Sequence, residues 1–180
     1  MALLKFVLGI GIAALTLLSC SNEKTLQRYL VDRQDDDMFL KIDIAASLLQ
    51  ADSGNMTQEE KDILATVKKI NVVAFPLNGE NEAQYDEKMQ ELKNIIDQDE
   101  YKTLMKFGSK KKGATLKYFG EEDAIDEIIV FASDDEKGFA LFRLLGENMR
   151  PDQMIKLLNS IENGDLDASK LSSIGQLFDM

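Results

Sequence analysis

The chain has 180 residues, with 21 basic and 32 acidic side chains and a formal net charge of -11. Hydrophobic residues make up 44% of it, which is enough for a folded core and excludes a disordered chain. Because so acidic a surface repels phosphate backbones, the composition argues against nucleic-acid binding.

An apolar segment opens the chain. Residues Phe6–Leu18 are apolar or small apart from Thr16, and Lys5 is the only charge before Cys20. The segment is shorter than the roughly 20 residues that a spanning helix needs. A basic start followed by a short apolar run is typical of a secretory signal peptide, so we predict that residues 1–19 are cleaved. An ordinary membrane anchor, or a buried thiol at Cys20, is the alternative.

The chain's only cysteine directly follows this run. Leu17-Leu18-Ser19-Cys20 resembles the bacterial lipobox, which implies that the Cys20 thiol carries diacylglycerol and that residues 20–25 form a lipidated tether. Two or three acyl chains hold a protein firmly on a membrane. We therefore expect an exported protein, lipid-anchored in the bacterial cell envelope. The outer membrane is favoured because Ser21 is not aspartate, and the periplasmic or surface face stays open.

The first half of the remaining chain alternates helices and strands. Leu26, Tyr29 and Leu30 have helical spacing, and the acidic residues 35–37 that follow are typical of a loop. Thr57 and Glu60 form a capping box, and the apolar face behind it continues through Ile70. The other expected elements are a strand at 38–43, a short helix at 44–51, a strand at 71–75 and a helix at 85–96.

In the second half, apolar residues recur with a period of two, which is typical of strands. Strands at 101–107 and 114–119 flank one hairpin turn at 108–113, and strands at 125–131 and 139–145 flank another at 133–138. Pro151 then suits the first turn of a helix that Gly164 ends, and a last short helix is expected over 166–177.

This order of elements indicates a single α+β domain over residues 26–180. The helical segment between the first two strands allows a parallel pair, whereas the two hairpins add antiparallel strands. We therefore expect a mixed, mainly antiparallel sheet with helices mostly on one face.

The pattern resembles a known family, domain-of-unknown-function family 4252, which includes Bacteroidetes-type exported lipoproteins. The resemblance implies an exported single α+β domain with no established activity, so it brings no catalytic residues. The segments that carry it are FLKIDIAASLL, INVVAF, YKTLMKF, ATLKYFG, EIIVFA and FALFRLLGENMRPDQMIKLL, between Leu26 and Ile161.

Several kinds of catalytic site are excluded by composition. Without histidine, neither a Ser-His-Asp nor a Cys-His arrangement is possible. One cysteine cannot form a thiolate metal cluster, and no glycine-rich phosphate loop has the usual spacing. Ser109 with Lys110 is formally a serine–lysine pair, but it falls in an expected exposed turn. We expect no enzyme, no cofactor and no metal site.

Two acidic clusters have alternative interpretations. Asp32 and the acidic residues 35–37 supply oxygen ligands that calcium prefers, but a solvated loop explains them more simply. Turn chemistry explains Asp134, Asp135 and Glu136. A pair of carboxylates could also hydrolyse an envelope glycan, although among 32 acids some pair always looks suitable.

One basic cluster stands out on this acidic chain. Lys110, Lys111 and Lys112 lie at the expected first hairpin tip, with Lys106 and Lys117 on its strands. The cluster could contact an anionic partner, or it could simply keep the hairpin soluble. The function that the sequence favours is a membrane-anchored, non-enzymatic binding module for an unknown envelope protein or ligand. The alternatives are a carboxylate-based glycan hydrolase and a calcium-dependent adhesin.

Overall fold

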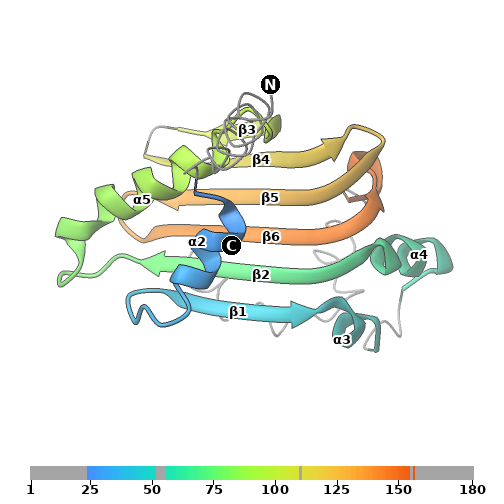
Figure 1. Cartoon of the computed structure of the whole chain (residues 1–180), viewed down its shortest axis with the longest axis horizontal. Helices are drawn as coiled ribbons and strands as arrows, with labels where there is room; N and C mark the ends of the chain where they lie inside the picture. The colour runs from blue at the N-terminus through green and yellow to red at the C-terminus, as the bar shows by residue number, and fades with distance from the viewer. Residues whose placement is uncertain (1–23, 52–55, 110, 155, 157–180) are drawn as a thin grey trace, which may run out of the picture.

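The computed structural model describes residues 24–51, 56–109, 111–154 and 156, and these residues form one α+β domain. Six strands make one antiparallel sheet, in the spatial order β1-β2-β6-β5-β4-β3 (Figure 1). The helices are α2 (Leu26–Asp32), α3 (Ala46–Ala51), α4 (Gln58–Thr66) and α5 (Glu82–Ile96). The strands are β1 (Leu40–Ala45), β2 (Val67–Pro76), β3 (Lys102–Gly108), β4 (Lys112–Glu121), β5 (Ala124–Asp134) and β6 (Gly138–Met149).

The pairing of β1 with β2 corrects one detail of the expected sheet. The sequence allowed a parallel pair, but the two strands run antiparallel, with Ile42 opposite Val72. A parallel connection would need helices that travel back along the strands. Instead, α3 and α4 pack together at the end where β1 finishes, so the chain re-enters the sheet from that same end (Figure 1). The sheet is therefore wholly antiparallel.

The start of α4 follows the prediction, and its end does not. The backbone amide of Thr57 donates to Glu60 Oε2 at 2.7 Å, and the Glu60 amide donates to Thr57 Oγ1 at 3.3 Å, which completes the capping box. The predicted apolar helical face continued to Ile70, but the helix ends at Thr66 and β2 begins at Val67. A shift of register between Val67 and Lys69 lets both Val67 and Ile70 be buried from the strand.

Both predicted hairpins are present, and the β5–β6 hairpin depends on a glycine. Gly138 has φ +114°, a conformation that side-chain-bearing residues rarely adopt. A Cβ atom there would lie 2.0 Å from the Phe75 carbonyl oxygen. The turn therefore lets β6 lie directly against β2, in the middle of the sheet.

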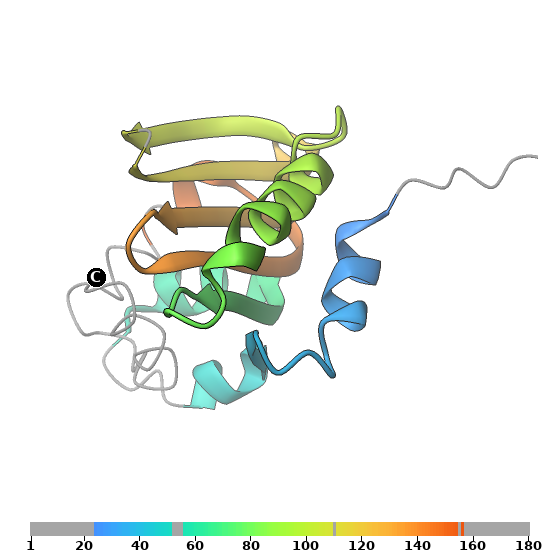
Figure 2. The same ribbon diagram turned by 90° about the vertical axis from the view of Figure 1, so that its left-hand side faces the viewer.

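Two hydrophobic cores lie on opposite faces of the same strands. Helices α2 and α5 cover one face of the sheet (Figure 2). This face holds an aromatic core in which Phe75 and Phe139 stack with ring centroids 5.3 Å apart. On the opposite face, α4 contributes Ile63 and Leu64 to a core at one end of the strands. The helix expected from Pro151 begins as predicted, but its continuation and the last predicted helix lie outside the described residues.

Candidate functional site

A hollow of about 510 Å³ lies between the C-terminal half of α5 and strands β3, β4 and β5. We call it the lysine groove, because ammonium and hydroxyl groups dominate its wall. Its polar lining comprises Lys93, Asp97, Lys106, Ser109, Thr115, Lys117 and Ser133. The elements that supply these side chains are far apart in the sequence, and the sheet brings them together.

Lys117 is the fixed cation of the groove. Its side chain is 6% exposed, and its Nζ donates to the Ile96 carbonyl at 2.5 Å and to Asp97 Oδ1 at 2.6 Å. The carbonyl is at the C-terminal end of α5, where a positive charge is favoured by the helix dipole. This arrangement stabilises a buried ammonium that would otherwise be expensive to desolvate.

The other two lysines of the groove have no anionic partner among the described residues. Lys93 Nζ lies 5.7 Å from the centre of the Phe131 ring, a cation–π contact. No carboxylate within the described ranges forms an ion pair with Lys93 or Lys106. Counting Lys117 and Asp97, the charged lining is three cations and one anion, so the groove is locally positive on an acidic protein.

The structure describes two of the three lysines predicted at the hairpin tip, residues 110–112, and these two differ in their surroundings. Lys110 lies outside the described residues, and Lys111 is exposed. Lys112 Nζ is 3.4 Å from Asp134 Oδ2, on the acidic turn of the neighbouring hairpin. A backbone hydrogen bond from Glu136, supported by Lys112, holds the pKa of Asp134 below its usual value. The acidic turn therefore offsets part of the charge of the tip.

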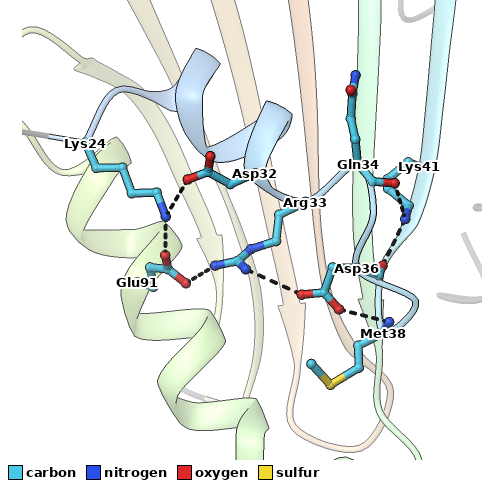
Figure 3. A network of polar contacts seen from close by, with 8 residues as sticks. All are labelled: Lys24, Asp32, Arg33, Gln34, Asp36, Met38, Lys41 and Glu91. Atoms are coloured by element: carbon cyan, nitrogen blue, oxygen red, sulfur yellow. Dashed lines mark hydrogen bonds and ion pairs between the residues drawn. The ribbon is translucent and has the colours of Figure 1, made fainter.

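Two aspartates of the acidic stretch near residues 32–37, Asp32 and Asp36, form ion pairs (Figure 3). Lys24 Nζ contacts Asp32 at 3.2 Å and Glu91 at 2.7 Å, and Arg33 bonds both Glu91 and Asp36. We call these five residues the α2 clamp, because they hold α2 against α5. Within the described part of the chain, no three metal-binding side chains lie close enough together to hold an ion.

The carboxylates with shifted pKa values do not resemble general acids. Partial burial tends to raise the pKa of Glu91, but the hydrogen bond from Lys24 and the charge of Arg33 outweigh it, so the pKa is lowered. The pKa of Asp134 is also lowered. A glycosidase acid needs the opposite shift.

Sequence reasoning missed a buried ion pair beneath α2. Arg143 Nη2 lies 2.7 Å from Glu127 Oε2, and both side chains are 7% exposed. Arg143 also donates to Gln27 of α2 at 2.6 Å. The available signal was one arginine within the apolar strand FALFRLL.

A second hollow, of about 430 Å³, lies between α2 and strands β1 and β2. Its charged lining balances, with Lys41 and Lys69 against Asp35 and Asp43, and Lys69 lies 3.2 Å from Asp43. It therefore lacks the excess positive charge of the lysine groove.

The predicted signal peptide and Cys20 lie outside the described residues. Among the residues that the structure does describe, no helix is long and apolar enough to cross a membrane. A family model with the description "Domain of unknown function (DUF4252)" matches residues 29–157. No curated protein and no solved structure matches the chain.

Proposed function

Since the chain belongs to the DUF4252 family, whose description states no activity, we propose its function from its own residues. It is a lipid-anchored, non-enzymatic module of the bacterial envelope that binds an anionic ligand in the lysine groove. The anchor is the Cys20 thiol, and the outer membrane is the favoured location.

The observation that carries the binding proposal is the donor set of the groove. Lys93 and Lys106 have no ion-pair partner among the described residues, and the hydroxyl-bearing residues Thr115 and Ser133 line the same hollow. The Ser109 hydroxyl is already hydrogen-bonded within its own turn. Ammonium and hydroxyl groups suit a carboxylate or phosphate group, and hydrogen bonds to charged groups are the stronger ones. The absence of histidine from the chain supports binding over hydrolysis.

The anchoring proposal is supported by the position of Lys24. Lys24 is held by the α2 clamp, and it lies four residues after Cys20. Four extended residues reach about 14 Å at most. A lipid on Cys20 would therefore keep the domain close to the bilayer surface.

The ligand test uses inorganic phosphate and pyrophosphate as probes, titrated into the purified protein at constant ionic strength. We expect saturable binding that Lys93→Gln with Lys106→Gln weakens by about tenfold or more, since charge-assisted hydrogen bonds are lost. Lys61→Gln with Lys68→Gln, two changes outside the groove lining, is the matched charge control and should leave the affinity unchanged. Equal effects of both changes, or no saturation, would reject the groove as the site.

The anchor test labels cells with a fatty-acid probe. The wild-type protein should take the label, and Cys20→Ala should take none and leave the membrane fraction. An unlabelled wild-type protein, or a Cys20→Ala protein that stays on the membrane, would refute the proposed lipid anchor. Either result would leave the proposal of ligand binding in the lysine groove unchanged.

A further inference from the structure

The sheet face opposite α2 and α5 carries two complete rows of apolar residues. The strand register places one residue from every strand in each row. The middle row is Ile42, Val72, Phe142, Val130, Leu116 and Met105. The outer row is Leu40, Ala74, Ala140, Ala132, Ala114 and Phe107.

The described helices leave the outer row uncovered. Both α3 and α4 lie at the opposite end of the strands (Figure 1). Three large side chains at the ends of the two rows are exposed, namely Leu40 at 43%, Met105 at 49% and Phe107 at 56%. Ala74 and Ala140, in the middle of the outer row, are nevertheless fully buried, although none of the described helices lies over them. Monomeric proteins rarely leave an extended apolar surface to water, so a further segment is expected to cover these rows.

We propose that this face is the docking surface for the C-terminal segment of the same chain, residues 157–180. The described residues just before this segment lie on the same face of the sheet as the two rows. After β6, the described chain turns back so that Met154 is 7% exposed within the core on this same face. Residues beyond it therefore begin next to the rows rather than on the side of α2.

The segment is long enough to cover the rows. From Ile128 in the near core to Ala132 in the outer row is four residues, or about 13 Å along a strand. Six strands are about 24 Å wide. Residues 157–180 would span about 36 Å even if they were wholly helical.

The apolar pattern of the segment matches the surface. Leu171, Ile174 and Leu177 are spaced three residues apart, which places them together on one side of a helical segment. The four alanines of the outer row form a low floor between Leu40 and Phe107, and small floor residues let another segment pack closely. Burial of both apolar surfaces drives the docking.

The test measures how fast a thiol reagent modifies a cysteine placed in the floor. The full chain carries Cys20→Ser with Ala132→Cys, so the new thiol is the single one. We expect slow modification that does not depend on protein concentration. Leu171→Asp with Ile174→Asp and Leu177→Asp should accelerate it by about tenfold or more, because the cover opens. Ser172→Asp with Ser173→Asp and Gln176→Asp is the matched control, with the same three added charges, and should have no effect.

Three results would overturn the proposal. Fast modification in the otherwise unaltered segment would show an open face. Protection that rises with protein concentration would assign the face to a second copy of the chain. Protection that survives the three aspartates, in a protein with unchanged circular dichroism, would exclude the segment as the cover.

Discussion

Arg143 is the charged residue on which the position of α2 depends most directly. It lies in the central strand β6 beneath α2, where it bonds Glu127 and Gln27. Removing one partner of a buried ion pair leaves an uncompensated charge, whereas removing both can be nearly neutral. Buried ion pairs of this kind often add little net stability, and the hydrogen bond from Arg143 to Gln27 connects this pair to α2.

The first prediction concerns this pair. Glu127→Ala should lower the free energy of unfolding by about 3–5 kcal/mol, because Arg143 stays buried without its carboxylate. Glu127→Gln, which keeps an acceptor, should lose less, and Glu127→Leu with Arg143→Met should recover most of the loss. Urea denaturation of the four proteins measures this. A loss below about 1 kcal/mol for Glu127→Ala would mean that the pair is effectively solvated.

A second prediction at this scale concerns Gly138. Its positive φ and the 2.0 Å approach of a Cβ atom to the Phe75 carbonyl make any side chain unfavourable. Gly138→Ala should lower the free energy of unfolding by about 1–3 kcal/mol. Gly79→Ala is the control, since a Cβ there meets nothing within 4 Å. Equal thermal midpoints for the two variants would contradict the argument.

Among the elements, α2 is the one whose attachment depends on charge. Lys24 and Arg33 of the α2 clamp both bond Glu91 on α5 (Figure 3). The folded protein thus lowers the pKa of Glu91 below 4.5. A carboxyl with a lowered folded pKa contributes stability above its unfolded pKa and loses it as pH falls.

The third prediction follows from this sign. Wild type should be more stable than Glu91→Gln at pH 7, and the difference should shrink as pH falls below about 4.5 toward the lower folded pKa. Chemical denaturation across pH 2–7 measures the difference. Glu87→Gln, an exposed neighbour on α5, should show little difference at any pH. A constant gap between wild type and Glu91→Gln would show that Glu91 does not act through its charge.

Some boundaries and strand directions of this fold can be predicted from the sequence, and others cannot. The capping box at Thr57 is local chemistry, so the start of α4 was predicted correctly. The end was not, because Val67 and Ile70 have a spacing that suits both a helix and a bulged strand. The direction of β1 relative to β2 depends on where α3 and α4 pack, which no local pattern records.

At the scale of the whole molecule, the sequence predicts only part of the lysine groove. The basic cluster at residues 110–112 drew attention to the right hairpin, but Lys112 proves to be paired with Asp134. Lys93 lies on α5, and Lys106 lies on an edge strand. Only the packing of α5 across β3, β4 and β5 brings these two lysines to one hollow, and that packing is a long-range property.

The two cores predict how the molecule unfolds. Every central strand supplies side chains to both faces, as in β5, where Ile129 enters the aromatic core and Ile128 the opposite one. Loss of the strand pairing therefore removes both cores together, and a single cooperative transition is expected. The chain has no tryptophan. The fluorescence of a single introduced tryptophan therefore reports the unfolding of the sheet face on which it is placed.

The fourth prediction uses a tryptophan on each face. Tyr85→Trp reports the face covered by α2 and α5, and Phe142→Trp reports the opposite face. After correction for the stability change of each variant, the fluorescence transition should coincide with the loss of far-ultraviolet circular dichroism in the same protein, with equal slopes against urea. The Glu127→Ala change, placed in both backgrounds, should shift the two transitions equally, because a destabilised α2 face cannot unfold while the strands beneath it still hold the other core. A shift confined to the Tyr85→Trp protein would show that α2 and α5 detach from a sheet that stays folded.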